Sequence, residues 1–193
     1  MLALSGCVVD SEPRDPPAAG GTPSPSTTAT DSPGETSTAS PSETTDSLGD
    51  DGAYVDRDGF SIVFPPTWEV RADVAGLQVA GFPPEQLAPD FADNVGVIFE
   101  DTGDPNITAE EYLDASARNA PSLMDDFDLV ETVVIDDAAT LEYTGSFTRP
   151  LHFLALIRVK DGKAFTATFT ATPETYEVGL SVAREILESL RVT

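Results

Sequence analysis

Residues 151–171, LHFLALIRVKDGKAFTATFTA, decide the fold that this sequence predicts. Two apolar runs, 151–159 and 164–171, flank a short polar turn with Asp161-Gly162 at its centre. Asp-Gly is a strong signal for a two-residue hairpin loop, because both residues tolerate positive φ. The stretch therefore predicts an antiparallel β-hairpin.

The register of this hairpin determines which side chains share a face. With Asp161-Gly162 as the loop, Leu154 lies opposite Phe169 and Leu156 lies opposite Ala167. The other face of the first strand is also apolar, since it carries Phe153, Ala155 and Ile157. Because strand residues alternate between the two faces of a sheet, both faces need cover. We expect this hairpin in the middle of a sheet, with cover on both sides.

A second hairpin is predicted at the start of the apolar part of the chain. Tyr54-Val55 and the alternating run FSIVF at 60–64 are separated by a turn with Asp58-Gly59. Pro65-Pro66 ends the second strand, because proline cannot donate to a ladder, and Trp68 follows as a large apolar plug. Further strand-like runs lie at 77–82, 94–100, 129–135 and 138–144.

Two helices are predicted to supply the cover. Thr108 and Glu111 form a capping box for the first helix, which we expect to be disturbed near Pro121 and to end at Asp125-Asp126. The last helix is predicted to begin with Thr172 as N-cap and Pro173 as its first residue. Its core-facing stripe follows helical spacing and comprises Tyr176, Leu180, Ala183, Leu187 and Leu190.

The segment GFSIVFPPTW at 59–68 resembles the opening of PsbP/Mog1-like domains, especially those of the bacterial envelope lipoproteins called LpqN-like and DcrB-like. The order of elements over 54–193, ending in ILESLRV at 186–192, is similar to theirs. The resemblance implies an α+β fold with an antiparallel sheet between helical layers, an α/β/α sandwich. Its motif marks the core of the fold and no active site, so it implies no functional residue and no activity.

The N-terminal residues MLALSGC end in a segment, LSGC, that resembles the lipobox of bacterial lipoproteins. In that motif a diacylglyceryl group is attached to the cysteine. We therefore expect Cys7 to be lipidated, with palmitate among its acyl chains, and to anchor the chain on the extracytoplasmic face of the bacterial cell membrane. Residues 1–7 are interpreted as a truncated signal peptide, since the basic and apolar parts of a full one are missing.

Residues 8–53 are predicted to form a disordered acidic linker. Residues 8–52 contain 16 Ser or Thr and seven Pro, with Leu48 the only large apolar residue after Val9. Such a segment buries too little apolar surface to offset its ordering entropy. Its expected role is that of a flexible spacer between the membrane anchor and the folded domain. Its composition is also typical of O-glycosylated stalks. The folded domain is expected over 54–193.

The charge balance excludes some classes of partner. The chain has 34 acidic and ten basic residues, for a net charge of −24. Nucleic acid is not an expected partner, because binding it requires Lys or Arg to neutralise phosphates. Adhesion to anionic lipid by charge alone is disfavoured for the same reason. So much acid favours solubility and repulsion between copies, so we expect a monomer.

Chemistry-bearing motifs are sparse. His152 is the only histidine and Cys7 the only cysteine, which excludes a disulfide within the chain and metal sites that need two imidazoles. A Ser-His-Asp triad would depend on His152, yet the chain has no Gly-x-Ser-x-Gly elbow. Asp125-Asp126 and Asp136-Asp137 lack the spacing of a calcium loop, so only a weak surface calcium site stays open. We expect no cofactor and no metal.

The segment GFPPEQLAPDFAD at 81–93 is the longest irregular stretch inside the predicted domain. Its prolines exclude a central strand, yet it carries Phe82, Leu87 and Phe91. These residues are the candidate contacts for an apolar ligand or a partner protein. The alternative is that they fold back and anchor the loop to the sheet.

Together these features predict a lipid-anchored, non-enzymatic binding or assembly module for an envelope protein or an apolar ligand such as a lipid. Two alternatives stay open: a hydrolase of unusual design that uses His152, and a purely structural surface protein. Replacement of His152 by Ala separates the module from the enzyme, because only the enzyme would lose activity.

Overall fold

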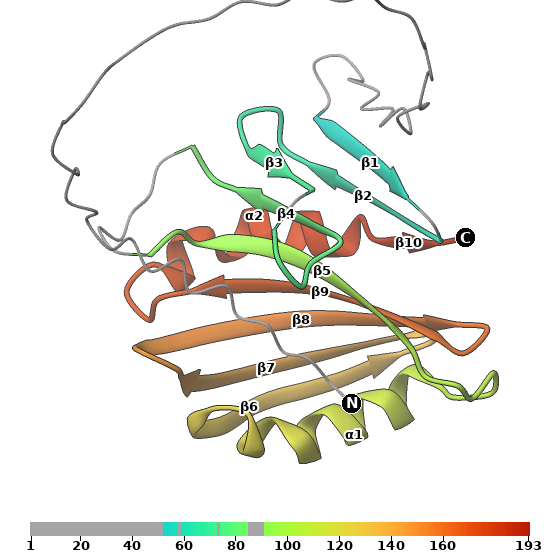
Figure 1. The fold of residues 1–193 in the computed structure, drawn as a ribbon. Coiled ribbons are helices and arrows are strands. Elements are labelled where there is room, and N and C mark those ends of the chain that lie inside the picture. The colour runs from blue at the N-terminus through green and yellow to red at the C-terminus, as the bar shows by residue number, and fades with distance from the viewer. Residues whose placement is uncertain (1–51, 58, 73, 85–90) are drawn as a thin grey trace, which may run out of the picture. The chain divides into compact units, whose positions relative to one another are not determined.

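The computed structural model describes residues 52–57, 59–72, 74–84 and 91–193 (Figure 1). All of these described residues belong to one compact unit. The predicted signal segment at 1–7 and nearly all of the predicted linker at 8–53 lie outside the described residues, so both stay predictions.

The described residues form ten strands, two α-helices and one 3-10 helix. The first half of the domain contains β1 (Ala53–Arg57), β2 (Phe60–Phe64), β3 (Glu69–Arg71), β4 (Val79–Phe82), β5 (Asn94–Asp101), α1 (Ala109–Asn119) and η1 (Ala120–Ser122). The second half contains β6 (Asp125–Ile135), β7 (Ala138–Ser146), β8 (Pro150–Lys160), β9 (Lys163–Ala171), α2 (Tyr176–Glu188) and β10 (Arg191–Val192).

The strands form two antiparallel sheets. The larger sheet has the order β3-β4-β5-β9-β8-β7-β6, and the smaller sheet has the order β1-β2-β10. The fold class is confirmed as mostly antiparallel sheet with two helices, whereas the prediction of a single sheet was wrong. The small sheet forms because β10, which lies directly after the last helix, pairs with β2.

The hairpin of β8 and β9 has the predicted register and position. Leu154 pairs with Phe169 and Leu156 pairs with Ala167. Asp161 and Gly162 form the two-residue loop with φ values of 51° and 74°, which is why Asp-Gly suits it. The hairpin lies between β5 and β7, in the interior of the large sheet.

Each face of the large sheet has its own core (Figure 1). On one face α2 and the small sheet pack over β5, β9 and β8, with Phe64, Phe169 and Tyr176 among the buried residues. On the other face α1 packs over β7 and β8, with Leu113 and Phe153 among the buried residues. The two faces are called the α2 face and the α1 face below. Cover on both faces of the hairpin is thus confirmed.

The capping box of α1 is present. The Thr108 hydroxyl accepts a hydrogen bond from the Glu111 amide at 3.2 Å, and the Glu111 carboxylate accepts one from the Thr108 amide at 3.0 Å. The helix ends at Asn119, and Pro121 lies in the 3-10 turn that follows. The predicted disturbance near Pro121 is confirmed.

Two helix boundaries were wrong. Asp125-Asp126 begins β6 rather than ending a helix, because the 3-10 turn ends at Ser122 and Asp126 adopts a φ of 52°. Helix α2 begins at Tyr176 rather than at Pro173. The Thr172 hydroxyl bonds the Thr175 hydroxyl at 3.0 Å instead of capping a helix, so residues 172–175 form a separate turn.

The core-facing stripe of α2 is confirmed. Tyr176, Ala183, Leu187 and Leu190 are buried, and Leu180 is half-buried against the same cluster. Ile186 is also buried there. The short strands β3 and β10 were not predicted, because two or three residues carry too weak a periodicity to indicate a strand.

Candidate interaction surface

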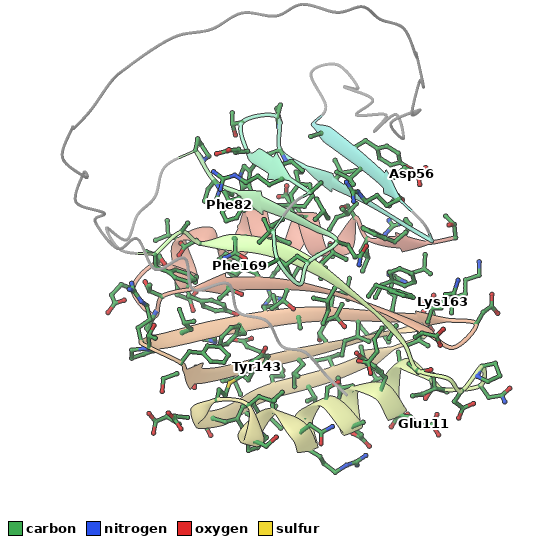
Figure 2. The ribbon with its side chains drawn as sticks, viewed as in Figure 1. Asp56, Phe82, Glu111, Tyr143, Lys163 and Phe169 are labelled. Atoms are coloured by element: carbon green, nitrogen blue, oxygen red, sulfur yellow. The ribbon has the colours of Figure 1, made fainter. Side chains whose placement is uncertain are left out.

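The structure describes two of the three candidate contact residues of the 81–93 segment. Phe82 is the last residue of β4 (Figure 2). The guanidinium carbon of Arg71 lies over the Phe82 ring, 4.9 Å from the ring centroid. Phe91 packs against the core cluster of the α1 face and has Arg149 5.7 Å from its ring centroid. Leu87, like Cys7, lies outside the described residues. The two rings therefore contact different arginines, and a joint role in partner binding stays a prediction.

His152 lies on β8 within a small polar cluster. Its Nε2 atom is 2.9 Å from Oε1 of Glu142 on the neighbouring strand β7. Its ring stacks on Tyr176 of α2, with centroids 3.5 Å apart and planes at 6°. Among the described residues, the side-chain hydrogen bond of His152 goes to a carboxylate and not to a hydroxyl that could act as a nucleophile.

Tyr176 closes this cluster from the α2 side. Burial raises the pKa of its phenol, and the nearby Glu142 carboxylate raises that pKa further. The phenol thus stays protonated at physiological pH. Its hydroxyl is buried beside that carboxylate. A protonated phenol cannot act as a general base, and the stacking of its ring on His152 packs α2 on the sheet.

Asp93 is a second buried titratable group near the start of α2. Its carboxylate accepts a hydrogen bond from the Thr175 hydroxyl at 2.9 Å. Burial raises the pKa of Asp93, while its hydrogen bonds with Thr175 and the Thr172 backbone oppose that shift. The interaction ties the turn before α2 to the residue that precedes β5.

Two other functional classes gain no support from the described part of the chain. It contains no group of three His, Cys, Asp or Glu side chains placed to hold a metal ion. None of its helices has the length and apolar character that crossing a membrane requires.

Strand β6 carries more than half of the large apolar residues that are exposed in the described part of the chain. Nine large apolar residues of the described part are exposed, and five of them lie in β6. Their exposed fractions run from 37% to 66%, for Leu129, Val130, Val133, Val134 and Ile135. Single exposed apolar residues are ordinary, whereas a contiguous group marks an interaction site. We call these five residues the β6 patch.

The β6 patch faces both sides of the sheet. Paired residues of neighbouring antiparallel strands point to the same face. Leu129 and Val134 pair with residues of the α1-face core, so they belong to the α1 face. Val133 and Ile135 belong to the α2 face, as does Glu131, which pairs with Glu142. The extra residue Val130 lies at a register shift.

The outer edge of β6 is unpaired within the described part, because β6 ends the strand order of the large sheet. Register shifts interrupt its pairing with β7 before Glu131. From Glu131 to Ile135 the pairing with β7 is regular over five consecutive residues. This stretch combines a straight main-chain edge with apolar side chains, which is the structure that accepts an added strand.

The sequence predicted a strand at 129–135 but not its exposure. The segment LVETVVI is as rich in β-branched residues as a buried strand, so its composition did not indicate an edge. A signal was available in the charges. Residues 119–148 carry seven acidic residues and no Lys, Arg or His, which is unusual for a segment that crosses a core.

The comparisons with known proteins concern the fold. No protein-family model matches the chain, and no curated protein matches it. The crystal structure of LpqN from Mycobacterium tuberculosis, described as involved in cell envelope biogenesis, is 12% identical, with a TM-score of 0.52 over 75% of this chain and 87% of LpqN. The solution structure of cyanobacterial PsbP from Synechocystis is 20% identical, with a TM-score of 0.49 over 70% of this chain and 87% of that one.

The likeness to LpqN agrees with the resemblance that residues 59–68 indicated. At 12% identity it concerns the arrangement of strands and helices and not the activity. The described domain has an LpqN-like fold.

Proposed function

We propose that this chain is a membrane-anchored, non-enzymatic binding module of the bacterial envelope. In this proposal β6 recognises an extended segment of another envelope polypeptide by strand addition. Lipidation at Cys7 holds the chain on the extracytoplasmic face of the membrane, and the linker gives the domain reach.

The observation that carries the proposal is the β6 patch at an unpaired sheet edge. A strand added to an edge gains main-chain hydrogen bonds, and the side chains that flank the edge supply specificity. From Glu131 to Ile135 both requirements meet in one regular stretch. An exposed apolar edge of this kind is an aggregation hazard unless a partner covers it.

The same observation favours a polypeptide over a lipid. An acyl chain could cover the apolar side chains of the patch, but it has no groups that bond the amides and carbonyls of the edge. An extended peptide satisfies the main chain and covers the side chains together.

A photo-activated cross-linker placed at Ile135 in the full chain, in its native membrane, tests the proposal. The matched control is the same cross-linker at Val178 of α2. This position also holds an exposed β-branched aliphatic residue, with 68% exposure against 66% for Ile135. We expect adducts from Ile135 to map to one segment of another envelope protein. The change Val133→Lys should abolish them, because it puts a charge where the partner strand would lose an apolar contact.

Three results would refute the proposal. Lipid adducts from Ile135 would favour the apolar-ligand alternative. Adducts with a second copy of the chain would indicate a dimer. Equal yields of the same protein adduct from Ile135 and Val178 would show contact without a specific surface.

A separate experiment tests the anchor. With a complete signal peptide fused before residue 1, Cys7→Ala should move the protein from the membrane fraction to the medium, because the acyl chains are then missing. Retention of this variant in the membrane would show that lipidation at Cys7 is not the anchor.

A further inference from the structure

We infer that the partner segment carries Lys or Arg residues opposite Asp128 and Glu131 and apolar residues opposite Val133 and Ile135. This inference rests on the proposed strand addition at β6 and adds the chemistry of the partner. It follows from the way charge and apolar surface are divided along the strand.

The α2 face of β6 changes character along its length. Asp128 lies between two register shifts and Glu131 begins the regular stretch, whereas Val133 and Ile135 follow later in the strand. All four residues are exposed, and neither acid has an ion-pair partner among the described residues. A partner strand would therefore meet two uncompensated carboxylates and then two apolar side chains.

The negative charge at Glu131 is increased by a second carboxylate on the neighbouring strand β7. Glu131 lies directly opposite Glu142 of β7, a pairing of like charges that is unfavourable in a sheet. Glu142 has a partner in His152, whose Nε2 atom lies 2.9 Å from Oε1 of Glu142. Glu131 has no such partner among the described residues. A basic side chain on the other side of Glu131 would relieve the repulsion between the two carboxylates.

A second copy of this chain does not fit this surface. Two β6 strands would bring together two segments of 119–148, each with seven acids and no basic residue. The net charge of −24 on each chain adds a general repulsion. The charge pattern therefore favours a basic partner over self-association.

The direction of the added strand fixes the order of its residues. Every pairing in the large sheet is antiparallel, and antiparallel addition at β6 continues that pattern. The N-terminal half of the partner segment then faces Val133 and Ile135, and its C-terminal half faces Asp128 and Glu131. The expected segment has alternating residues that are apolar first and basic afterwards on one face.

Synthetic peptides as long as β6, 11 residues, test this inference on the full chain. The first peptide alternates Thr with Val in its N-terminal half and Thr with Lys in its C-terminal half. The second has Glu in place of each Lys, and the third has the two halves exchanged. Binding of the fluorescently labelled peptides is measured by anisotropy at low salt.

We expect the first peptide to bind about tenfold more tightly than the second and the third, since two cross-strand contacts change from attraction to repulsion or are lost. The change Glu131→Gln should reduce this preference severalfold. The matched change Glu188→Gln on the exposed face of α2 should leave it unaltered.

The outcomes separate the inference from the proposed function. Equal binding of the first and second peptides would overturn the inference and leave strand addition intact. Preference for the third peptide would overturn the antiparallel order. Failure of all three to bind would overturn the inference and the proposed function together.

Discussion

Strands β8 and β6 have the same length, 11 residues each, and lie two positions apart in one sheet. Both contain runs of large aliphatic residues, LALI in β8 and VVI in β6. Yet Ile157 in β8 is 1% exposed, and Ile135 in β6 is 66% exposed. The difference comes from their neighbours, because β8 has a strand on each side and cover on each face, whereas β6 pairs only with β7. Similar sequences thus hold the core together in one place and form a free edge in the other.

Replacing the two isoleucines gives the largest contrast between these strands. Ile157→Ala should lower the free energy of unfolding by ~2–5 kcal/mol, because it leaves a cavity in a packed core. Ile135→Ala should change it by less than about 0.5 kcal/mol, as exposed substitutions usually do. Chemical denaturation of both variants measures the contrast. Equal losses would show that β6 is covered in the native protein.

A smaller effect is expected where α2 covers the central hairpin. A Cβ atom at Gly179 would lie 2.7 Å from Cζ of Phe169, a buried ring of β9 (Figure 2). Alanine is normally ~1 kcal/mol better than glycine inside a helix. Overpacking against the ring costs ~1–3 kcal/mol, so Gly179→Ala should lower the melting temperature. The control Ser181→Ala, on the exposed side of α2, should leave the melting temperature unchanged. Stabilisation by Gly179→Ala would show that α2 packs loosely on β9.

Two buried tyrosines of the α1 face, Tyr143 of β7 and Tyr112 of α1, allow a comparison on the other side of the sheet. The Tyr143 hydroxyl is buried without a hydrogen-bond partner among the described residues, and burial raises the pKa of that phenol. The Tyr112 hydroxyl donates to Glu100 at 2.9 Å. Tyr143→Phe should therefore be neutral or stabilising by up to about 1 kcal/mol, whereas Tyr112→Phe should cost about 1 kcal/mol. Equal costs in urea denaturation would show that the Tyr143 hydroxyl has a partner.

The smallest effect is a pH dependence at Asp93, beside the central strands. Because burial raises the pKa of Asp93 in the fold, the native state binds its proton more tightly than the unfolded state does. The stability that this group contributes is thus full below its ordinary pKa of about 3.9 and falls as the pH rises through the raised pKa. Relative to wild type, Asp93→Asn should gain stability between pH 4 and pH 7.

Denaturation at the two pH values measures this change. The control Asp114→Asn concerns an exposed carboxylate on α1 and should show a smaller difference. A loss of stability of Asp93→Asn relative to wild type on raising the pH would mean that the charged form of Asp93 is favoured in the fold.

The sequence was most informative where periodicity and turn chemistry agreed. Asp161-Gly162 fixed the loop and hence the register of β8 and β9, and the alternation on both strands indicated cover on both faces. The stripe of α2 and the capping box of α1 were equally local signals. Each of these features depends on residues that are close together in the chain.

Features that depend on distant partners were not predictable. The exposure of β6 follows from its place at the end of the strand order, which no local pattern encodes. The pairing of β10 with β2 joins residues far apart in the sequence. The candidate surface was therefore predicted at Phe82, Leu87 and Phe91, on a proline-rich segment, whereas the sequence of the β6 patch is that of an ordinary strand.

Backbone hydrogen exchange with residue resolution tests the central claim, that β8 and β9 hold the fold and β6 is a free edge. We predict that amides of β8 and β9 exchange only through global unfolding. About half of the β6 amides between Glu131 and Ile135, those directed away from β7, should exchange rapidly. They should become protected when the first synthetic peptide, which carries Val and then Lys, is added. Strong protection of all β6 amides in the dilute chain without peptide, or no change on peptide addition, would contradict the account.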